Sequence, residues 1–151
     1  MKLEKVIEKL EELFKKWKLT YNDWVLVGEK GANLLGYKIR PRRGHIDVFV
    51  DKKKLPWQVQ KDVESTIPPK DSKEFREFKE FVRKTKHGPH LIPLPFKRWT
   101  IETARRNSII YHLNNKKKIR ILSPEANLKE RIEVLTLSDI PKSYLRQNAD
   151  F

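Results

Sequence analysis

Apolar residues recur at helical spacing in several segments of the chain. In residues 3–19 they fall three or four positions apart with Lys and Glu between them, which predicts an amphipathic helix packed over a sheet. A start that resembles a capping box, followed by a phenylalanine stripe, predicts a helix over residues 71–86, and we interpret its phenylalanines as core rather than as a base-stacking platform. Ser123, with Pro124 and Glu125 after it, predicts the start of another helix.

Strands are predicted where β-branched and aromatic residues are bounded by Gly, Pro or clusters of charge. Residues 23–28 and 45–51 are the clearest, and residues 107–113 and 118–122 flank a polar loop typical of a hairpin. Residues 90–96 contain two prolines, which lack the N–H that a central strand needs. We therefore expect an edge strand there.

These elements predict one α/β domain of the α+β type, with a mixed sheet flanked by helices. A length of 151 residues suits a single domain over residues 1–151, with its first helix in residues 1–19 and a weakly patterned tail in residues 136–151. Between the strands, Pro56 is expected to begin a short helix in residues 55–65.

The strand at residues 45–51 carries the candidate chemistry. Alternation puts its apolar β-branched residues on one face and His45, Asp47 and Asp51 on the other. We interpret Asp51 as a solvated carboxylate at the strand end. Two interpretations stay open for Asp47, which is either a structural carboxylate paired with a nearby arginine or a group that takes part in chemistry.

The chain is strongly basic, with 34 Lys+Arg against 20 Asp+Glu and a formal net charge of +14. Such a surface attracts polyanions, so nucleic acid or a nucleotide is the expected partner, RNA more than DNA. An anionic membrane surface is the rival, but no apolar run reaches 18 residues, and we expect a soluble, cytoplasmic protein. The absence of cysteine excludes disulfides, thiolate metal sites and cysteine nucleophiles.

The basic residues expected to contact nucleic acid lie mainly in predicted loops and at strand ends. They are Lys52, Lys53, Lys54, Lys97, Arg98, Arg105, Arg106, Lys116, Lys117 and Lys118. Trp57, Trp99 and Tyr111 are close to several of them in sequence, and such a mixture can bind phosphates and stack on unpaired bases. The alternative, solvated charges on a stable surface, stays open.

Residues 25–51 read as a strand, a glycine-bounded helix, a basic loop and a second strand. This order resembles the opening of the nucleotidyltransferase superfamily with the polymerase-beta-like fold, where an hG[GS] turn precedes a strand with the paired carboxylate Asp-x-Asp. Gly28, Gly36 and Tyr37 fall in register with the small-domain pattern G-G-x-A-x-x-x-x-G-Y. The resemblance implies a nucleotidyltransferase-like sheet and a catalytic, metal-binding Asp47.

The residues that the resemblance assigns to nucleotide binding are Gly28, Glu29, Arg42 and Arg43. Glu29 stands where the family has Gly or Ser, and a bulky anion there would repel a triphosphate. His45 stands at the first carboxylate position, so half of the oxygen platform for a divalent ion such as Mg²⁺ or Mn²⁺ is missing.

The resemblance continues into the second half of the chain. Small family members carry a third carboxylate on a strand of the type Asp-Leu-Ile-Pro, and its counterpart here begins at His90, although a shift of one residue would put Leu91 or Ile92 there. If His45, Asp47 and His90 converge, they form a two-histidine, one-carboxylate metal site suited to Mn, Fe, Ni or Zn.

Three functions follow from the resemblance. The first is a degenerate scaffold with a basic surface for nucleic acid or nucleotides. The second is an active metal-dependent nucleotidyltransferase that moves NMP from an NTP to a hydroxyl, with Asp47 as a metal ligand and Glu29 as an improvised second one. The third is one component of a toxin–antitoxin pair, which would need a protein partner.

Overall fold

The computed structural model describes residues 1–38, 44–61, 63 and 66–129. Two expected nucleotide-binding residues, Arg42 and Arg43, and the tail at residues 136–151 lie outside this part of the chain.

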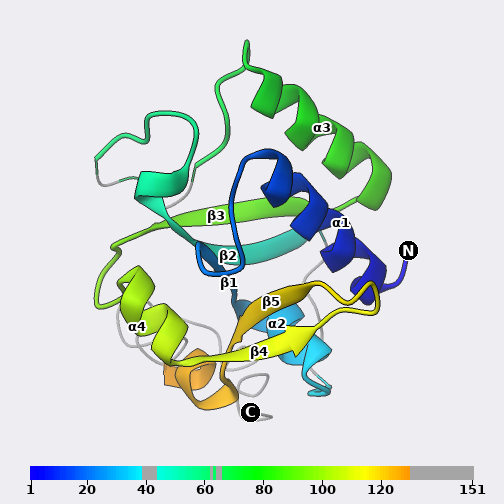
Figure 1. Cartoon of the computed structure of the whole chain (residues 1–151), viewed down its shortest axis with the longest axis vertical. Coiled ribbons are helices and arrows are strands. Elements are labelled where there is room, and N and C mark those ends of the chain that lie inside the picture. Colours follow the sequence, from blue (N-terminus) through cyan, green and yellow to red (C-terminus); the bar gives the residue numbers. More distant parts are fainter. Residues whose placement is uncertain (39–43, 62, 64–65, 130–151) are drawn as a thin grey trace, which may run out of the picture.

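Within the described residues a mixed sheet of five strands runs through the molecule in the order β3-β2-β1-β5-β4 (Figure 1). The strands are β1 (Trp24–Leu26), β2 (His45–Asp51), β3 (Gly88–Leu94), β4 (Ser108–His112) and β5 (Lys118–Leu122). β1 is antiparallel to β2 and parallel to β5, whereas β2 is parallel to β3 and β4 is antiparallel to β5. The expected α/β class is confirmed, as are the hairpin and the edge position of β3.

The helices lie on both faces of this sheet. They are α1 (Leu3–Lys16), α2 (Gly28–Leu34), the 3-10 helix η1 (Lys52–Lys54), α3 (Lys73–Thr85) and α4 (Ile101–Arg106), and residues 124–129 are also helical. The predicted caps form, because the Ser72 side chain accepts a hydrogen bond from the Phe75 N–H and Ser123 Oγ accepts one from the Ala126 N–H.

One local prediction was wrong, and one helix was not predicted. Residues 55–61 and 63, the described part of the helix expected to begin at Pro56, are not helical. Trp57 instead contacts Trp17 edge-on at 5.2 Å between ring centroids and donates a hydrogen bond to Thr66 Oγ1, so tertiary contacts override the local signal. The sequence reading also missed α4, whose start is marked by reciprocal hydrogen bonds between Thr100 and Thr103.

The alternation of β2 separates two hydrophobic clusters, one on each face of the sheet. Ile46, Val48 and Val50 belong to the larger cluster together with buried side chains of α1 and with Phe81 of α3. Phe49 belongs to the smaller cluster, which includes Ile101 of α4. The prediction that the first helix covers a sheet face is confirmed.

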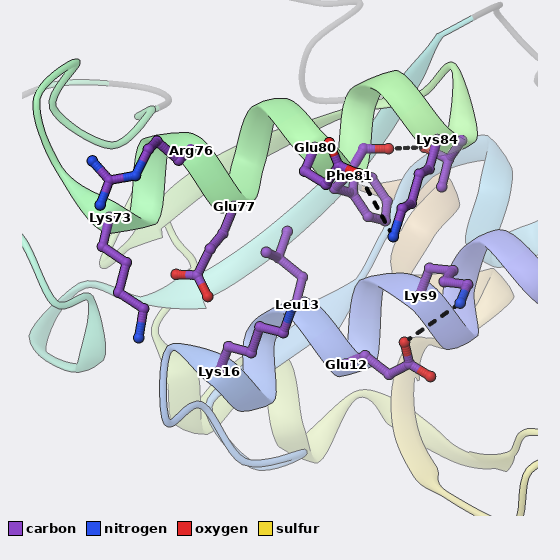
Figure 2. A pocket seen from close by; sticks show the side chains of 11 residues that line it. Lys9, Glu12, Leu13, Lys16, Lys73, Arg76, Glu77, Glu80, Phe81 and Lys84 are labelled. Carbon is purple, nitrogen blue, oxygen red and sulfur yellow. Dashed lines mark hydrogen bonds and ion pairs between the residues drawn. The ribbon is translucent and has the colours of Figure 1, made fainter.

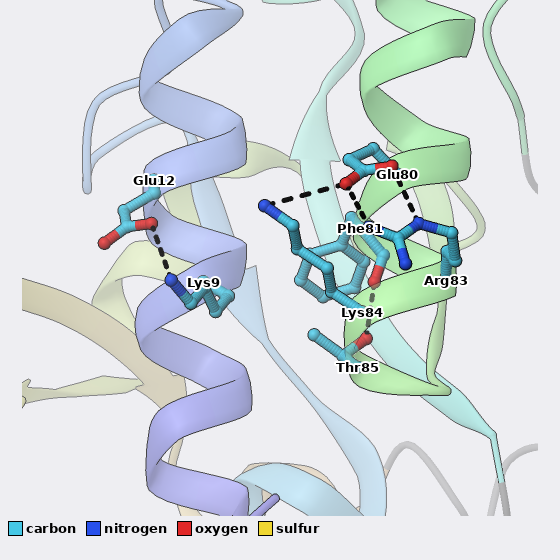
Figure 3. Close-up of polar contacts among 7 residues, drawn as sticks. All are labelled: Lys9, Glu12, Glu80, Phe81, Arg83, Lys84 and Thr85. Atoms are coloured by element: carbon cyan, nitrogen blue, oxygen red, sulfur yellow. Dashed lines mark hydrogen bonds and ion pairs between the residues drawn. The ribbon is translucent and has the colours of Figure 1, made fainter.

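α1 and α3 lie side by side over the larger cluster (Figure 3). The ion pairs drawn there stay within one helix, such as Lys9 with Glu12 on α1 and Arg83 with Glu80 on α3. Arg83 holds the pKa of Glu80 down to about 2. Between the helices is a cavity of about 260 Å³ with Leu13 and Phe81 among its walls and charges of both signs around it (Figure 2).

Candidate functional site

A cavity of about 220 Å³ lies beside the amino-terminal ends of β2 and β3. Its lining residues are Glu29, Lys30, His45, Asp47 and His90, and we call it the Asp47 cavity. Glu29 and Lys30 come from the first turn of α2, His45 and Asp47 from β2, and His90 from β3. The structure thus brings together the four residues singled out in the sequence and adds Lys30, which sequence reasoning missed.

Asp47 and His90 face each other on neighbouring parallel strands. The register pairs Asp47 with His90, and Nδ1 of the histidine lies 3.0 Å from Oδ1 of the aspartate. Leu91 is instead opposite Val48 and fully buried, so His90, and not Leu91, lies beside Asp47. An ionised carboxylate only accepts hydrogen bonds, so a neutral His90 carries its proton on Nδ1 and its basic lone pair on Nε2.

The turn at Gly28 allows α2 to approach Asp47 closely. Gly28 has a positive φ of 72°, and a Cβ there would lie 2.9 Å from Asp47 Oδ2. Asn127, which is fully buried, accepts a hydrogen bond from the Gly28 N–H and donates one to the Gly28 carbonyl, both at 3.0 Å. Only glycine fits this position without strain. Sequence reasoning missed Asn127, because no local pattern marks a contact across 99 residues.

Among the described residues that line the Asp47 cavity, there are two carboxylates and one ammonium group. Glu29 and Lys30 are both buried, so their charges are poorly screened by water. Burial lowers the pKa of Lys30 below its usual range, and the negative charges of Glu29 and Asp47 oppose this shift in part. With neutral histidines, these described residues together carry a negative charge, which suits a cation or a hydrogen-bond donor better than a bare phosphate.

The expected three-ligand metal site is not assembled in this conformation. Across residues 1–38, 44–61, 63 and 66–129, no group of three His, Cys, Asp or Glu side chains is placed to hold a metal ion. Asp47 and His90 supply an oxygen and a nitrogen ligand side by side, so a metal bound there with help from His45 stays a prediction.

Several basic residues from the sequence analysis gather at the opposite end of β2 and β3. Lys52, Lys53 and Lys54 form η1 directly after β2, and Lys97 and Arg98 lie in the turn after β3. Because β2 and β3 are parallel, their carboxyl ends lie at the same end of the sheet, and the two basic groups lie there together.

The remaining basic residues lie elsewhere. Lys116, Lys117 and Lys118 are at the β4–β5 turn, on the other side of the view from the end of β3 (Figure 1). Arg105 donates a hydrogen bond to the Asn22 carbonyl at 2.6 Å and so ties α4 to the segment before β1, while Arg106 is exposed at the end of α4.

The aromatic residues that the sequence placed near these clusters are used in packing. Besides the Trp57 contact described above, the Trp99 ring lies 5.4 Å from that of Phe49, and the Tyr111 hydroxyl donates a hydrogen bond to Glu4. All three side chains are half-buried and make contacts within the fold, so their stacking on bases stays a prediction.

No protein-family model, curated protein or solved structure matches this chain. In the part of the chain that the structure describes, no helix combines the length and the apolar character needed to cross a bilayer.

Proposed function

We propose that this protein binds RNA through its basic surface, on a nucleotidyltransferase-like scaffold whose catalytic acids are reduced to Asp47. The scaffold is supported by the order of its parts. β1 leads through the Gly28 turn into α2, β2 carries Asp47, and β3 carries His90 directly beside it. The resemblance of the sequence implies this same succession.

The observation that carries the proposal is the separation of charge between the two ends of β2 and β3. The described lining residues of the Asp47 cavity include more carboxylates than ammonium groups. The salt bridges found among the described residues lie on α1 and α3, apart from the pair of Asp47 with His90. The lysines of η1 and Lys97 take part in none of these, so their charge can act on a polyanion.

The proposal is tested by measuring the affinity for a short single-stranded RNA by fluorescence anisotropy between about 50 and 200 mM salt. Contacts to about four phosphates predict that log K falls with log salt at a slope of about −3, because each contact releases about 0.7 counterions. An oligomer of the same base sequence with an uncharged backbone is the control and is expected not to bind. Absence of RNA binding at the lowest salt, or affinity independent of salt, contradicts the proposal.

A second candidate is metal-dependent transfer of NMP, supported by the shared position of the Glu29 and Asp47 carboxylates in one cavity. These residues would hold Mg²⁺ or Mn²⁺, which would neutralise charge on the α-phosphate while the acceptor hydroxyl attacks it and pyrophosphate leaves. The test is transfer of radiolabel from α-labelled ATP or CTP to RNA with either metal. Transfer that is lost in Asp47→Asn establishes this activity, and its absence rejects this candidate while leaving the RNA-binding proposal intact.

A further inference from the structure

A second cavity, of about 450 Å³, lies at the carboxyl ends of β2 and β3. Its walls include Lys52, Lys61, Lys97, Pro93, Pro95 and Phe96, and we call it the lysine cavity. Lys52 directly follows β2, and the segment from Pro95 to Lys97 directly follows β3. The crevice outside the carboxyl ends of parallel strands is a common place for ligands in sheets of this class.

Charge of one sign gathers in this cavity. Among the residues that the structure describes, every charged residue lining this cavity is a lysine, whereas basic side chains and carboxylates are mixed around the cavity between α1 and α3. No salt bridge among the described residues involves Lys52, Lys61 or Lys97. The ammonium groups of these three lysines, beside apolar walls, create a positive potential in the cavity that favours an anionic ligand.

Phe96 gives the lysine cavity a flat apolar surface next to these charges. Its ring is half-buried against the smaller hydrophobic cluster, and Lys97 Nζ lies 5.2 Å from the ring centroid. Lys97 is exposed, so its ammonium can leave the ring for a phosphate when a planar group takes its place. An aromatic ring flanked by mobile ammonium groups is the combination that binds single-stranded nucleic acid.

We propose that the lysine cavity holds one unstacked base of single-stranded RNA, with Phe96 as its stacking surface and Lys52, Lys61 and Lys97 on the neighbouring phosphates. The cavity volume lies in the range of small-ligand sites, about 300–1,000 Å³. Duplex RNA keeps its bases paired and stacked, so it has no base to insert. This inference rests on the RNA binding proposed above and assigns it to one place.

The first test compares two triple variants that lose the same charge. Lys52→Gln, Lys61→Gln and Lys97→Gln empty the lysine cavity of cations, and Lys9→Gln, Lys16→Gln and Lys73→Gln, which line the cavity between α1 and α3, are the matched control. On single-stranded RNA, the first set is expected to reduce the salt slope by about 2, because three contacts at about 0.7 counterions each are lost. The control set should leave the slope nearly unchanged.

The second test addresses stacking. Phe96→Leu keeps an apolar side chain but removes the flat ring, so it is expected to weaken single-stranded binding by about tenfold, while Phe96→Tyr retains the affinity. Duplex RNA should be insensitive to Phe96→Leu. Circular dichroism melts of each variant confirm that the fold is kept, and the Leu and Tyr variants are compared only at temperatures where both are folded.

The outcomes separate the two proposals. If the wild-type protein binds RNA but both triple variants weaken it equally, the charge acts diffusely, and the lysine-cavity assignment fails while RNA binding stands. If Phe96→Leu binds like the wild type, or affects single-stranded and duplex RNA alike, base insertion is overturned. A wild-type protein that binds no RNA overturns both.

Discussion

Gly28 and Asp47 approach each other so closely beside the Asp47 cavity that a single added carbon would disturb them. The glycine turn lets the first turn of α2 approach the strand that carries the aspartate, and a Cβ at this position would lie 2.9 Å from the Asp47 carboxylate. The geometry of the cavity therefore depends on an absent side chain.

Gly28→Ala is expected to lower the free energy of unfolding by about 2–3 kcal/mol. A left-handed backbone costs a residue with a side chain about 1–2 kcal/mol, and the contact with Asp47 adds to this. Gly36→Ala is the matched control, because Gly36 also has a positive φ but nothing lies within 4 Å of its Cβ position. Urea unfolding measures the free energy of unfolding of both variants. Equal losses in the two variants would show that the Asp47 contact carries no cost.

Lys30 makes the stability of the protein depend on pH in the alkaline range. Its pKa is lowered from 10.5 in the folded state, chiefly by burial, so the unfolded state binds more protons between the lowered pKa and 10.5. The free energy of unfolding therefore rises with pH through this window. Lys30→Met is expected to remove that rise. Denaturant unfolding of both proteins at a series of pH values up to 10.5 checks this, and parallel curves would contradict it.

At the scale of residues, most members of the Asp47 cavity were singled out before the fold was known. The strand pattern and the glycine turn identified Gly28, His45 and Asp47, because their spacing is local. Lys30 and Asn127 could not be found in this way. A lysine in a basic chain and an asparagine on a predicted helix carry no signal until the structure buries them.

At the scale of elements, the helical segment at residues 124–129 is joined to the Gly28 turn by one side chain. Both side-chain hydrogen bonds of Asn127 go to backbone groups of Gly28. This contact holds the end of β1 and the start of α2 against an element that is far away in sequence.

Asn127→Ala is expected to destabilise the protein by about 2–4 kcal/mol, because a buried N–H and a buried carbonyl each lose their partner. Lys129→Ala, on the exposed side of the same helical segment, should change stability little. Hydrogen exchange of the Gly28 amide gives a direct readout and should accelerate in the first variant only. An unchanged exchange rate would mean that another group satisfies the turn.

The success of the element predictions followed the strength of the local signals. The prolines of β3 indicated an edge strand correctly, because proline lacks the donor that a central strand needs. The helix expected after Pro56 failed because Trp57 is held by Trp17 and Thr66, which a local reading does not include.

At the scale of the whole molecule, the net charge of +14 acts against the folded state. Repulsion among the cations is strongest at low ionic strength, so added NaCl should raise the melting temperature. The variant that carries Lys9→Gln, Lys16→Gln and Lys73→Gln should show a smaller increase. Differential scanning calorimetry at a series of NaCl concentrations checks this, and a melting temperature that falls as salt increases would contradict it.

The two cavities occupy opposite ends of one pair of parallel strands. Asp47 and Lys52 are five residues apart in an extended segment, which corresponds to about 17 Å. RNA held at the lysine cavity therefore need not enter the Asp47 cavity, and substitutions in the two places can be studied separately.

The amino-acid sequence by itself determined the class of fold, most elements, the faces of β2 and the basic character of the surface. Helices, strands and their buried faces follow from periodicity within one segment, and the basic character is the sum of the charges along the chain. Only the tertiary structure decided that His90 faces Asp47, that Asn127 holds Gly28, and that three separate lysines converge beside Phe96. Each of these depends on how distant segments pack, and periodicity within one segment carries no information about that.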